Sequence, residues 1–484
     1  MRQLTSLDAQ FLALESARQS GHVGGVAVLD PSTTAVGSLA VDDIKALIEE
    51  RLPLLPPLQW RLAEVPLSLD YPYWVDDEDF DLDFHVRELA LPPPGSDVQL
   101  AEQIARIMSR PLDRGRPLWE LYLIHGLPLG QVAVLTKIHH ALIDGMSGAE
   151  IMGLLLDLTP EGTEMPEGTA KAMAVHHNPS QWELLGRGLM GLPRYPLRML
   201  RAAPGVLPNV EEAPAVFGSI PGAGTVGRLA RVAQRVVAGN GRPDSVKFDA
   251  PHTTFNGRIS AHRRFVFGQM ELASVKAVKD EQGVTVNDVV VAICASAVRR
   301  WLIAHEELPD EPLVAQIPVS VRTSEEVGTY GNKIMLMSVP LFTNEPDPIR
   351  RLRRTHTALR DMKERHKALP AQLLQDANHF IPPAVFARAA QLTFRLSSSG
   401  AARPAWNLVI SNVPGPQLPL YMAGAKLVAN YPVSVITDGM GLNITVMSYD
   451  GHMDFGIVGD RDQMPDLWQL IEWLNDGLDE LSTS

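Results

Sequence analysis

Cysteine is almost absent from this sequence, since its 484 residues include only one, Cys294. A single cysteine cannot form an intramolecular disulfide, which indicates a reducing compartment such as the cytoplasm. Cys294 lies in the apolar run 289–297, so a small buried core residue is favoured there over a nucleophile.

Long hydrophobic runs are also lacking. No stretch reaches the roughly 18 consecutive apolar residues that a membrane-spanning helix requires. Asp8 interrupts the N-terminus before it can form the apolar core of a secretory signal. We therefore expect a protein that is not exported and whose membrane contacts, if it makes any, are peripheral.

Positive charge is scarce as well, because 43 Lys and Arg face 56 Asp and Glu, giving a net charge of −13. A general nucleic-acid binder needs an excess of basic residues on its binding face, so this class is disfavoured. Arginines nevertheless cluster in one part of the chain. Two interpretations stay open: they contact anionic lipid headgroups, or they are solvated charges of a linker. They are Arg187, Arg194, Arg198 and Arg201, in a stretch without acidic residues, and then Arg228, Arg231 and Arg235.

The organisation of the chain predicts two α/β domains. The hydrophobic content of 45% and charged content of 20% are typical of a globular protein, and the length exceeds what one core usually organises. Residues 1–165 form the first predicted domain, 166–250 a Pro- and Gly-rich crossover, and 251–484 the second domain. We expect helices at 6–15, 41–51, 271–281 and 286–303, and strands at 119–125, 131–138 and 261–267.

The most informative segment is 137–145, Lys-Ile-His-His-Ala-Leu-Ile-Asp-Gly, at the end of a predicted strand. If the strand stays extended, His140 shares a face with Ile138, while His139 points the other way. A neutral imidazole can take a proton from an alcohol and later return it. Two adjacent histidines that point apart are awkward metal ligands, so we expect no metal site.

The residues after the histidines fit a turn that supports them. Asp144 could orient a ring, and Gly145 permits a left-handed backbone conformation. A helix is predicted to follow and to run to about Leu158. A purely structural role for the histidines is the alternative, and the complete His-His-x-x-x-Asp-Gly pattern makes it the less favoured one.

Further motifs accompany the histidines in a fixed order along most of the chain. These elements are 4–11 (LTSLDAQF), 116–120 (RPLWE), 286–290 (VNDVV), 318–322 (PVSVR), 411–416 (SNVPGP) and 441–444 (GLNI) with 448–449. Taken together with the histidine motif, they resemble the wax ester synthase/diacylglycerol acyltransferase family, a branch of the superfamily of chloramphenicol acetyltransferase, carnitine acyltransferases and condensation domains.

This resemblance implies a fold and a set of site residues. The fold is two chloramphenicol-acetyltransferase-like domains, each a mixed sheet with flanking helices, with His140 at their interface on a channel open from two sides. His140 is then the general base and His139 second in rank, while Asp144, next to Gly145, pairs structurally with Arg322. Asn287 is either an oxyanion donor or a helix cap, and both roles stay open.

The resemblance also implies acyl-CoA as co-substrate, no bound cofactor, and direct transfer without an acyl-enzyme. Diacylglycerol is the favoured acceptor, giving triacylglycerol, because the likeness is strongest to triacylglycerol-forming members; long-chain alcohols, giving wax esters, are the other acceptor. We expect a cytoplasmic protein at the inner membrane face or on lipid droplets. The alternatives are a condensation-type enzyme that uses a carrier protein, and a non-catalytic lipid-binding or droplet protein.

Overall fold

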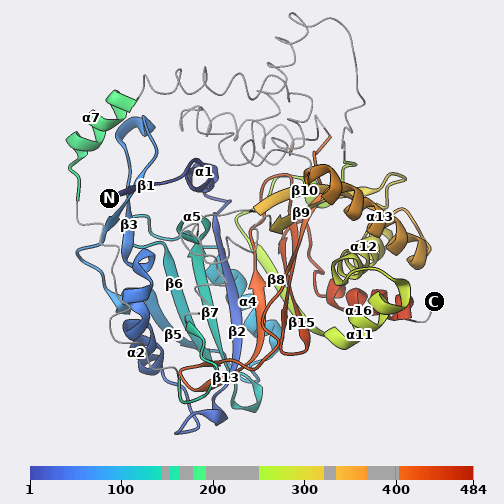
Figure 1. The fold of residues 1–484 in the computed structure, drawn as a ribbon, viewed down its shortest axis with the longest axis horizontal. Helices are drawn as coiled ribbons and strands as arrows, with labels where there is room; N and C mark the ends of the chain where they lie inside the picture. The colour runs from blue at the N-terminus through green and yellow to red at the C-terminus, as the bar shows by residue number, and fades with distance from the viewer. Residues whose placement is uncertain are drawn as a thin grey trace, which may run out of the picture.

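Two six-stranded β-sheets form the framework of the described residues, and a smaller three-stranded sheet lies near the N-terminal one (Figure 1). The computed structural model describes residues 1–143, 155–162, 178–191, 250–320, 334–367 and 403–482, with the single residues 153, 398 and 400. Helices flank both large sheets, which confirms the mixed α/β class. The small sheet comprises β1 (Arg2–Gln3), β4 (Tyr73–Asp76) and β3 (Trp60–Ala63).

The N-terminal sheet is antiparallel except where β5 pairs with β6. All eight residues of β7 are buried, because both faces of this inner strand are covered. Helix α2 (Val41–Arg51) packs on one face of the sheet and α4 (Asp97–Met108) on the other. Across the sheet the order is β12 (Tyr421–Met422), β13 (Ala425–Val433), β2 (His22–Asp30), β7 (Val132–His139), β6 (Trp119–His125) and β5 (Val86–Ala90).

Strands β12 and β13 come from the C-terminal part of the chain yet complete the N-terminal sheet. β13 runs antiparallel to β2, with partners from Lys426 and Asp30 to Val433 and Gly24. The backbone N–H of Asn430 on β13 also donates to a carboxylate oxygen of Asp454 on β15 at 2.7 Å. These strands therefore tie the two sheets to each other.

The C-terminal sheet is covered by helices on one face, at the right of Figure 1. β11 pairs parallel with both β9 and β14, and the other pairs are antiparallel. The strand order is β10 (Ile334–Leu341), β9 (Leu313–Ser320), β11 (Leu408–Val413), β14 (Leu442–Tyr449), β15 (His452–Asp460) and β8 (Arg263–Glu271). The helices are α11 (Leu272–Gln282), α12 (Val286–Ala304), α13 (Pro348–Lys367) and α16 (Gln469–Ser482).

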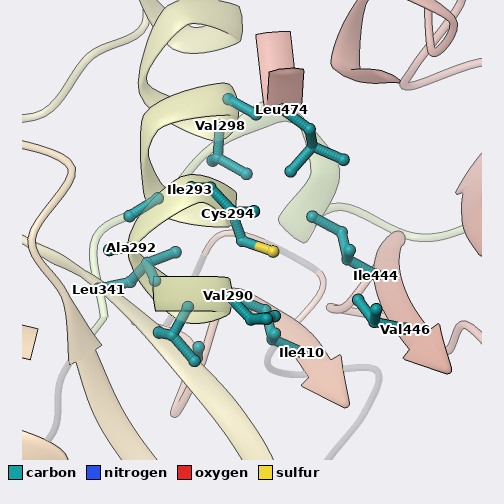
Figure 2. Close-up of a cluster of buried hydrophobic side chains, with 14 of the residues drawn as sticks. Val290, Ala292, Ile293, Cys294, Val298, Leu341, Ile410, Ile444, Val446 and Leu474 are labelled. Atoms are coloured by element: carbon teal, nitrogen blue, oxygen red, sulfur yellow. The ribbon is translucent and has the colours of Figure 1, made fainter. Parts of the chain in front are cut away.

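Helix α12 forms the centre of the C-terminal core. The side chain of Thr285 caps it, and Asp288 completes a capping box with the Thr285 backbone. Figure 2 shows Cys294 on this helix among apolar side chains that include Ile444 and Leu474. Complete burial raises the pKa of the Cys294 thiol, which confirms the expected core role.

A separate apolar cluster joins the two halves. It combines one face of α4 with side chains of β2 and β7 from the N-terminal sheet and of β8 and β15 from the C-terminal one. Phe265 and Phe267 on β8 and Tyr431 on β13 supply its aromatic rings. Burial of this much apolar surface fixes the two sheets against each other.

Except for the helix predicted after Gly145, which falls largely outside the described residues, the predicted helices and strands are confirmed to within a few residues. The remaining helices described are α1 (Ser6–Leu14), α3 (Leu82–His85), α5 (His140–Ile143) and α7 (Gln181–Gly191). Within the described part of the chain, none of the helices has the length and apolarity needed to cross a membrane.

Candidate functional site

The histidine pair lies where strand β7 gives way to a short helix. β7 ends at His139, and His140 is the first residue of α5. The condition for His140 to share a face with Ile138, a strand that stays extended through His140, is therefore not met, because the helix begins at His140. His139 is 1% exposed, whereas His140 is only partly buried, so the two rings meet different surroundings.

Both ring nitrogens of His139 have a polar neighbour. Its Nδ1 accepts the backbone N–H of Ala141 at 3.1 Å, and its Nε2 lies 3.2 Å from Oε1 of Glu15. A nitrogen that accepts a hydrogen bond carries no proton, so in the neutral ring the proton is on Nε2 and faces the carboxylate. His139 is consequently ill placed to act as a base.

Glu15 follows the last residue of α1 and is held from three sides. It accepts the N–H of Gly21 at 2.8 Å, and Arg114 Nη2 and Nε lie 2.8 and 3.2 Å from its other oxygen. Burial alone would raise the pKa of the Glu15 carboxyl, but His139, Gly21 and Arg114 together lower it to about 2. Glu15 is therefore a carboxylate at neutral pH.

His140 is oriented by contacts on its ring and on its backbone. The ring stacks on Phe11 of α1, with centroids 3.9 Å apart and planes inclined by 15°. The backbone N–H of His140 donates to the carbonyl oxygen of Gly21 at 2.9 Å. Figure 1 shows α1 and α5 close to each other at one end of the N-terminal sheet.

Gly21 is required by close approach. A Cβ atom at this position would lie 2.7 Å from Nε2 of His139 and 3.3 Å from the carbonyl oxygen of Phe11. Both distances are shorter than an ordinary carbon contact. Any other residue here would force the His139 ring to shift from its position beside Glu15.

A small cavity opens between the two halves near the histidines. Its wall combines Ser20, His22 and Met108 with Arg263 and Ser434. His22 on β2 is the register partner of His139 on β7, so the cavity borders the strand pair that carries the site.

Asn287 is the second residue of α12, in the C-terminal half of the molecule. Thr285 caps this helix, so the helix-cap role considered for Asn287 is not the one it has. The Oδ1 atom of Asn287 lies 3.4 Å from Nδ2 of Asn412. The next residue, Asp288, pairs with His356 at 2.8 Å.

Three predicted site residues, Asp144, Gly145 and Arg322, lie outside the described residues, as does the basic crossover over 192–249. Sequence reasoning gave no role to Phe11, Gly21, Glu15 or Arg114. Glu15 and His139 are more than a hundred residues apart, and no local spacing links them. The segment 4–11 of the family motif was the one available signal that this region matters.

Comparison with solved structures defines the class of the protein. A wax ester synthase/diacylglycerol acyltransferase from Marinobacter aquaeolei aligns over 100% of this chain and 99% of its own, with a TM-score of 0.70 and 29% identity. The first condensation domain of the calcium-dependent antibiotic synthetase aligns over 99% of this chain and 95% of its own, with a TM-score of 0.55 and 14% identity. The second likeness shows the fold alone and confirms the predicted two-domain, chloramphenicol-acetyltransferase-like architecture.

Sequence comparisons narrow the class to a family. Residues 4–290 match the wax ester synthase/diacylglycerol acyltransferase catalytic domain, and residues 330–482 match the WS/DGAT C-terminal domain. A putative diacylglycerol O-acyltransferase of Mycobacterium tuberculosis is 36% identical over 99% of this chain and 90% of its own length. The O-acyltransferase WSD of Acinetobacter baylyi is 32% identical over 98% and 96%. The chain belongs to the wax ester synthase/diacylglycerol acyltransferase family, and its activity is acyl transfer.

Proposed function

We propose that this chain transfers an acyl group from acyl-CoA to the hydroxyl of diacylglycerol, forming triacylglycerol, and also to long-chain alcohols, with His140 as the general base. The observation that carries the assignment is that His139 is buried with Nδ1 bonded to Ala141 and Nε2 beside Glu15, whereas His140 is partly exposed and so is the better placed imidazole for proton transfer. The names of the relatives support the two acceptor classes.

The chemistry needs a single base. His140 takes the proton of the acceptor hydroxyl as its oxygen attacks the thioester carbonyl, and a C–O bond forms. The tetrahedral intermediate then expels the CoA thiolate, breaking the C–S bond, and His140 returns the proton to the sulfur. Both substrates are bound together, so no acyl-enzyme is formed.

The oxyanion of that intermediate needs a donor, and Asn287 is our candidate. Because Thr285 already caps α12, the amide of Asn287 is not needed at the helix end. Asn412 approaches its Oδ1, which leaves the Nδ2 group as its donor side. Asp144 and Arg322 are proposed to pair and, with Gly145, to support the turn that follows His140.

The decisive experiment compares two histidine substitutions in purified protein. Radiolabelled palmitoyl-CoA is offered with diacylglycerol and with hexadecanol in parallel, and the products are separated by chromatography. His140→Ala should lower the rate by roughly 10²–10⁴-fold. The control, His125→Ala, removes a histidine that pairs with Glu88 at the end of β6 and should leave the rate unchanged. A His140→Ala rate equal to the wild-type rate would favour the non-catalytic alternative.

The same assay separates the remaining alternatives. Free palmitoyl-CoA should support ester formation, whereas a condensation-type enzyme would require the acyl group on a carrier protein. Triacylglycerol should form faster than wax ester. A faster reaction with hexadecanol would reverse the assignment of the acceptor.

We also propose that helix α7 meets a lipid surface, where such acceptors dissolve. Trp182 and Met190 on this helix are 82% and 71% exposed, although both side chains are strongly apolar. Leu184 and Gly188 face the opposite way, onto Val65 and its neighbours. An apolar helix face that is followed in the sequence by many arginines suits the surface of an anionic bilayer.

Vesicle sedimentation tests this contact. Vesicles containing anionic phospholipid should carry down the wild type, and the double variant Trp182→Ser/Met190→Ser should bind several-fold more weakly. Leu129→Ser is the matched control, because Leu129 is 93% exposed in the β6–β7 turn, at the other end of β7 from His139. Equal sedimentation of the double variant and the wild type would refute the role of α7.

A further inference from the structure

Helix α1 contacts both histidines of the site through two side chains four residues apart. Phe11 stacks on the ring of His140, and Glu15, directly after the helix, faces the ring of His139. On a helix, positions four apart lie on the same side, so one element reaches both rings. Family membership assigns no role to these contacts, and the proposed mechanism does not use them.

We propose that Glu15 is a positioning residue for acyl transfer, acting on His140 through His139 and the backbone of α5. The proposal rests on the function proposed above. The carboxylate holds the proton of His139 on Nε2, which leaves Nδ1 to accept the N–H of Ala141. Ala141 is the second residue of α5, so this hydrogen bond fixes the helix that begins with His140.

The position of the His139 proton follows from what each neighbouring atom can donate or accept. A proton on Nδ1 would meet the N–H of Ala141, donor against donor, and the hydrogen bond would be lost. A negative charge beside Nε2 excludes that tautomer, because it favours an N–H pointing toward it. Without the carboxylate, His139 no longer has a preferred tautomer, and the start of α5 loses its anchor.

Arg114 keeps the carboxylate in place. Its Nη2 donates to the carbonyl oxygen of Leu12 in the last turn of α1 at 2.7 Å and to Glu15 at 2.8 Å. Its Nη1 lies 3.2 Å from Glu64, a second carboxylate that is 61% exposed. The charged and titratable groups near Glu15 are thus His139 and Arg114, with His22 on the neighbouring strand.

The pair Glu15 and Glu64 offers a matched test, since both carboxylates contact Arg114 but only Glu15 faces His139. Glu15→Gln keeps the size of the side chain and removes its charge, so an amide N–H₂ must face either Arg114 or the pair of donors from Gly21 and His139. We expect kcat to fall roughly 10–100-fold with KM for both substrates within about twofold, because positioning is lost and binding is not. Glu64→Gln should keep both constants.

A spectroscopic measurement tests the relay without relying on activity. In protein with ¹⁵N-labelled histidine, the His139 signals, assigned with a His139→Gln variant, should report the Nε2–H tautomer in the wild type. Glu15→Gln should convert them to a mixture of tautomers, and Glu64→Gln should not. If Glu15→Gln folds poorly, Arg114→Gln serves in its place, since Arg114 is 40% exposed, with a several-fold loss of kcat at unchanged KM.

The outcomes separate the two proposals. Unchanged kcat, or an unchanged His139 tautomer, in folded Glu15→Gln would overturn the positioning role. A parallel rise in KM would also overturn it, because it would place Glu15 in substrate binding. If the wild type transfers no acyl group from acyl-CoA, the proposed function fails, while the nitrogen signals still decide whether Glu15 sets the tautomer of His139.

Discussion

Adding one methyl group at Gly21 should damage the site without changing any chemical group in it. In Gly21→Ala, the new Cβ would lie 2.7 Å from Nε2 and 3.2 Å from Cε1 of His139, and 3.3 Å from the carbonyl oxygen of Phe11. Carbon atoms in proteins normally approach to about 3.5–4.0 Å, so the ring must move by somewhat less than about 1 Å. The movement changes the 3.2 Å contact with the Glu15 carboxylate, because the crowded atom, Nε2, is the one that faces it.

The size of the effect follows from how little room the ring has. His139 is 1% exposed, and its other nitrogen is bonded to Ala141, so displacing the ring strains that contact as well. Overpacking a close-packed interior costs about 1–3 kcal/mol. A misplacement of about 1 Å passed on to the reacting groups can lower the rate roughly 100-fold, and since the moved ring here is the neighbour of the proposed base, we expect kcat to fall by at least about tenfold.

Two measurements on the same preparation decide the matter: initial rates of acyl transfer, and the midpoint of thermal unfolding. Gly25→Ala, four residues further along in β2, is the control, because its Cβ would meet only the ends of the Asn430 and Thr136 side chains, at 3.1 and 3.8 Å. Gly21→Ala should lose both activity and stability relative to Gly25→Ala. Wild-type values of both in Gly21→Ala would show that the ring is not confined as described.

Three further changes follow from buried groups. Glu15→Gln should cost about 3 kcal/mol of unfolding free energy at neutral pH, because the pKa of Glu15 falls from 4.5 to about 2 on folding. The difference in unfolding free energy between wild type and variant should shrink as the pH drops from about 4.5 towards 2. Urea titrations at several pH values measure it, and a constant difference would contradict the prediction. Lys137→Met removes one cation from beside the buried carboxylate of Glu120, which among the described residues then retains Arg87 and Tyr122. The urea midpoint should fall by the equivalent of about 3 kcal/mol. An unchanged midpoint would refute this prediction. Cys294 should resist thiol reagents until the protein unfolds, because burial raises its pKa; rapid labelling of the native protein would show that the core around α12 opens.

Local pattern predicted much of this fold. The helices at 41–51 and 286–303 carry their own period and end signals, and the strands around the turn at 126–130 carry theirs. The placement of β13 beside β2 could not be read in this way, because partners about four hundred residues apart share no local signal. Thr285, which caps α12, was passed over in favour of Asn287, since both residue types suit a helix start and only the geometry separates them.

The site was predicted in part. The identity of the histidines came from their motif, but their inequality came from neighbours that the motif does not contain. The two histidines differ because Glu15 lies beside His139 and Phe11 stacks on His140. Both contacts come from α1 and the residue after it, which are far from the histidines in the sequence. The domain limits drawn at 165 and 250, and the roles of Asp144 and Arg322, stay predictions.

The position of β13 bears on the order in which this protein can take shape. During translation β2 leaves the ribosome long before residues 425–433 are synthesised. The edge of β2 that pairs with β13 therefore has no partner strand for most of translation. A fragment that stops at residue 290 would keep that edge permanently and would expose backbone donors and acceptors to neighbouring chains. Both histidines precede that point, yet the sheet that supports them closes only after nearly all of the chain has emerged.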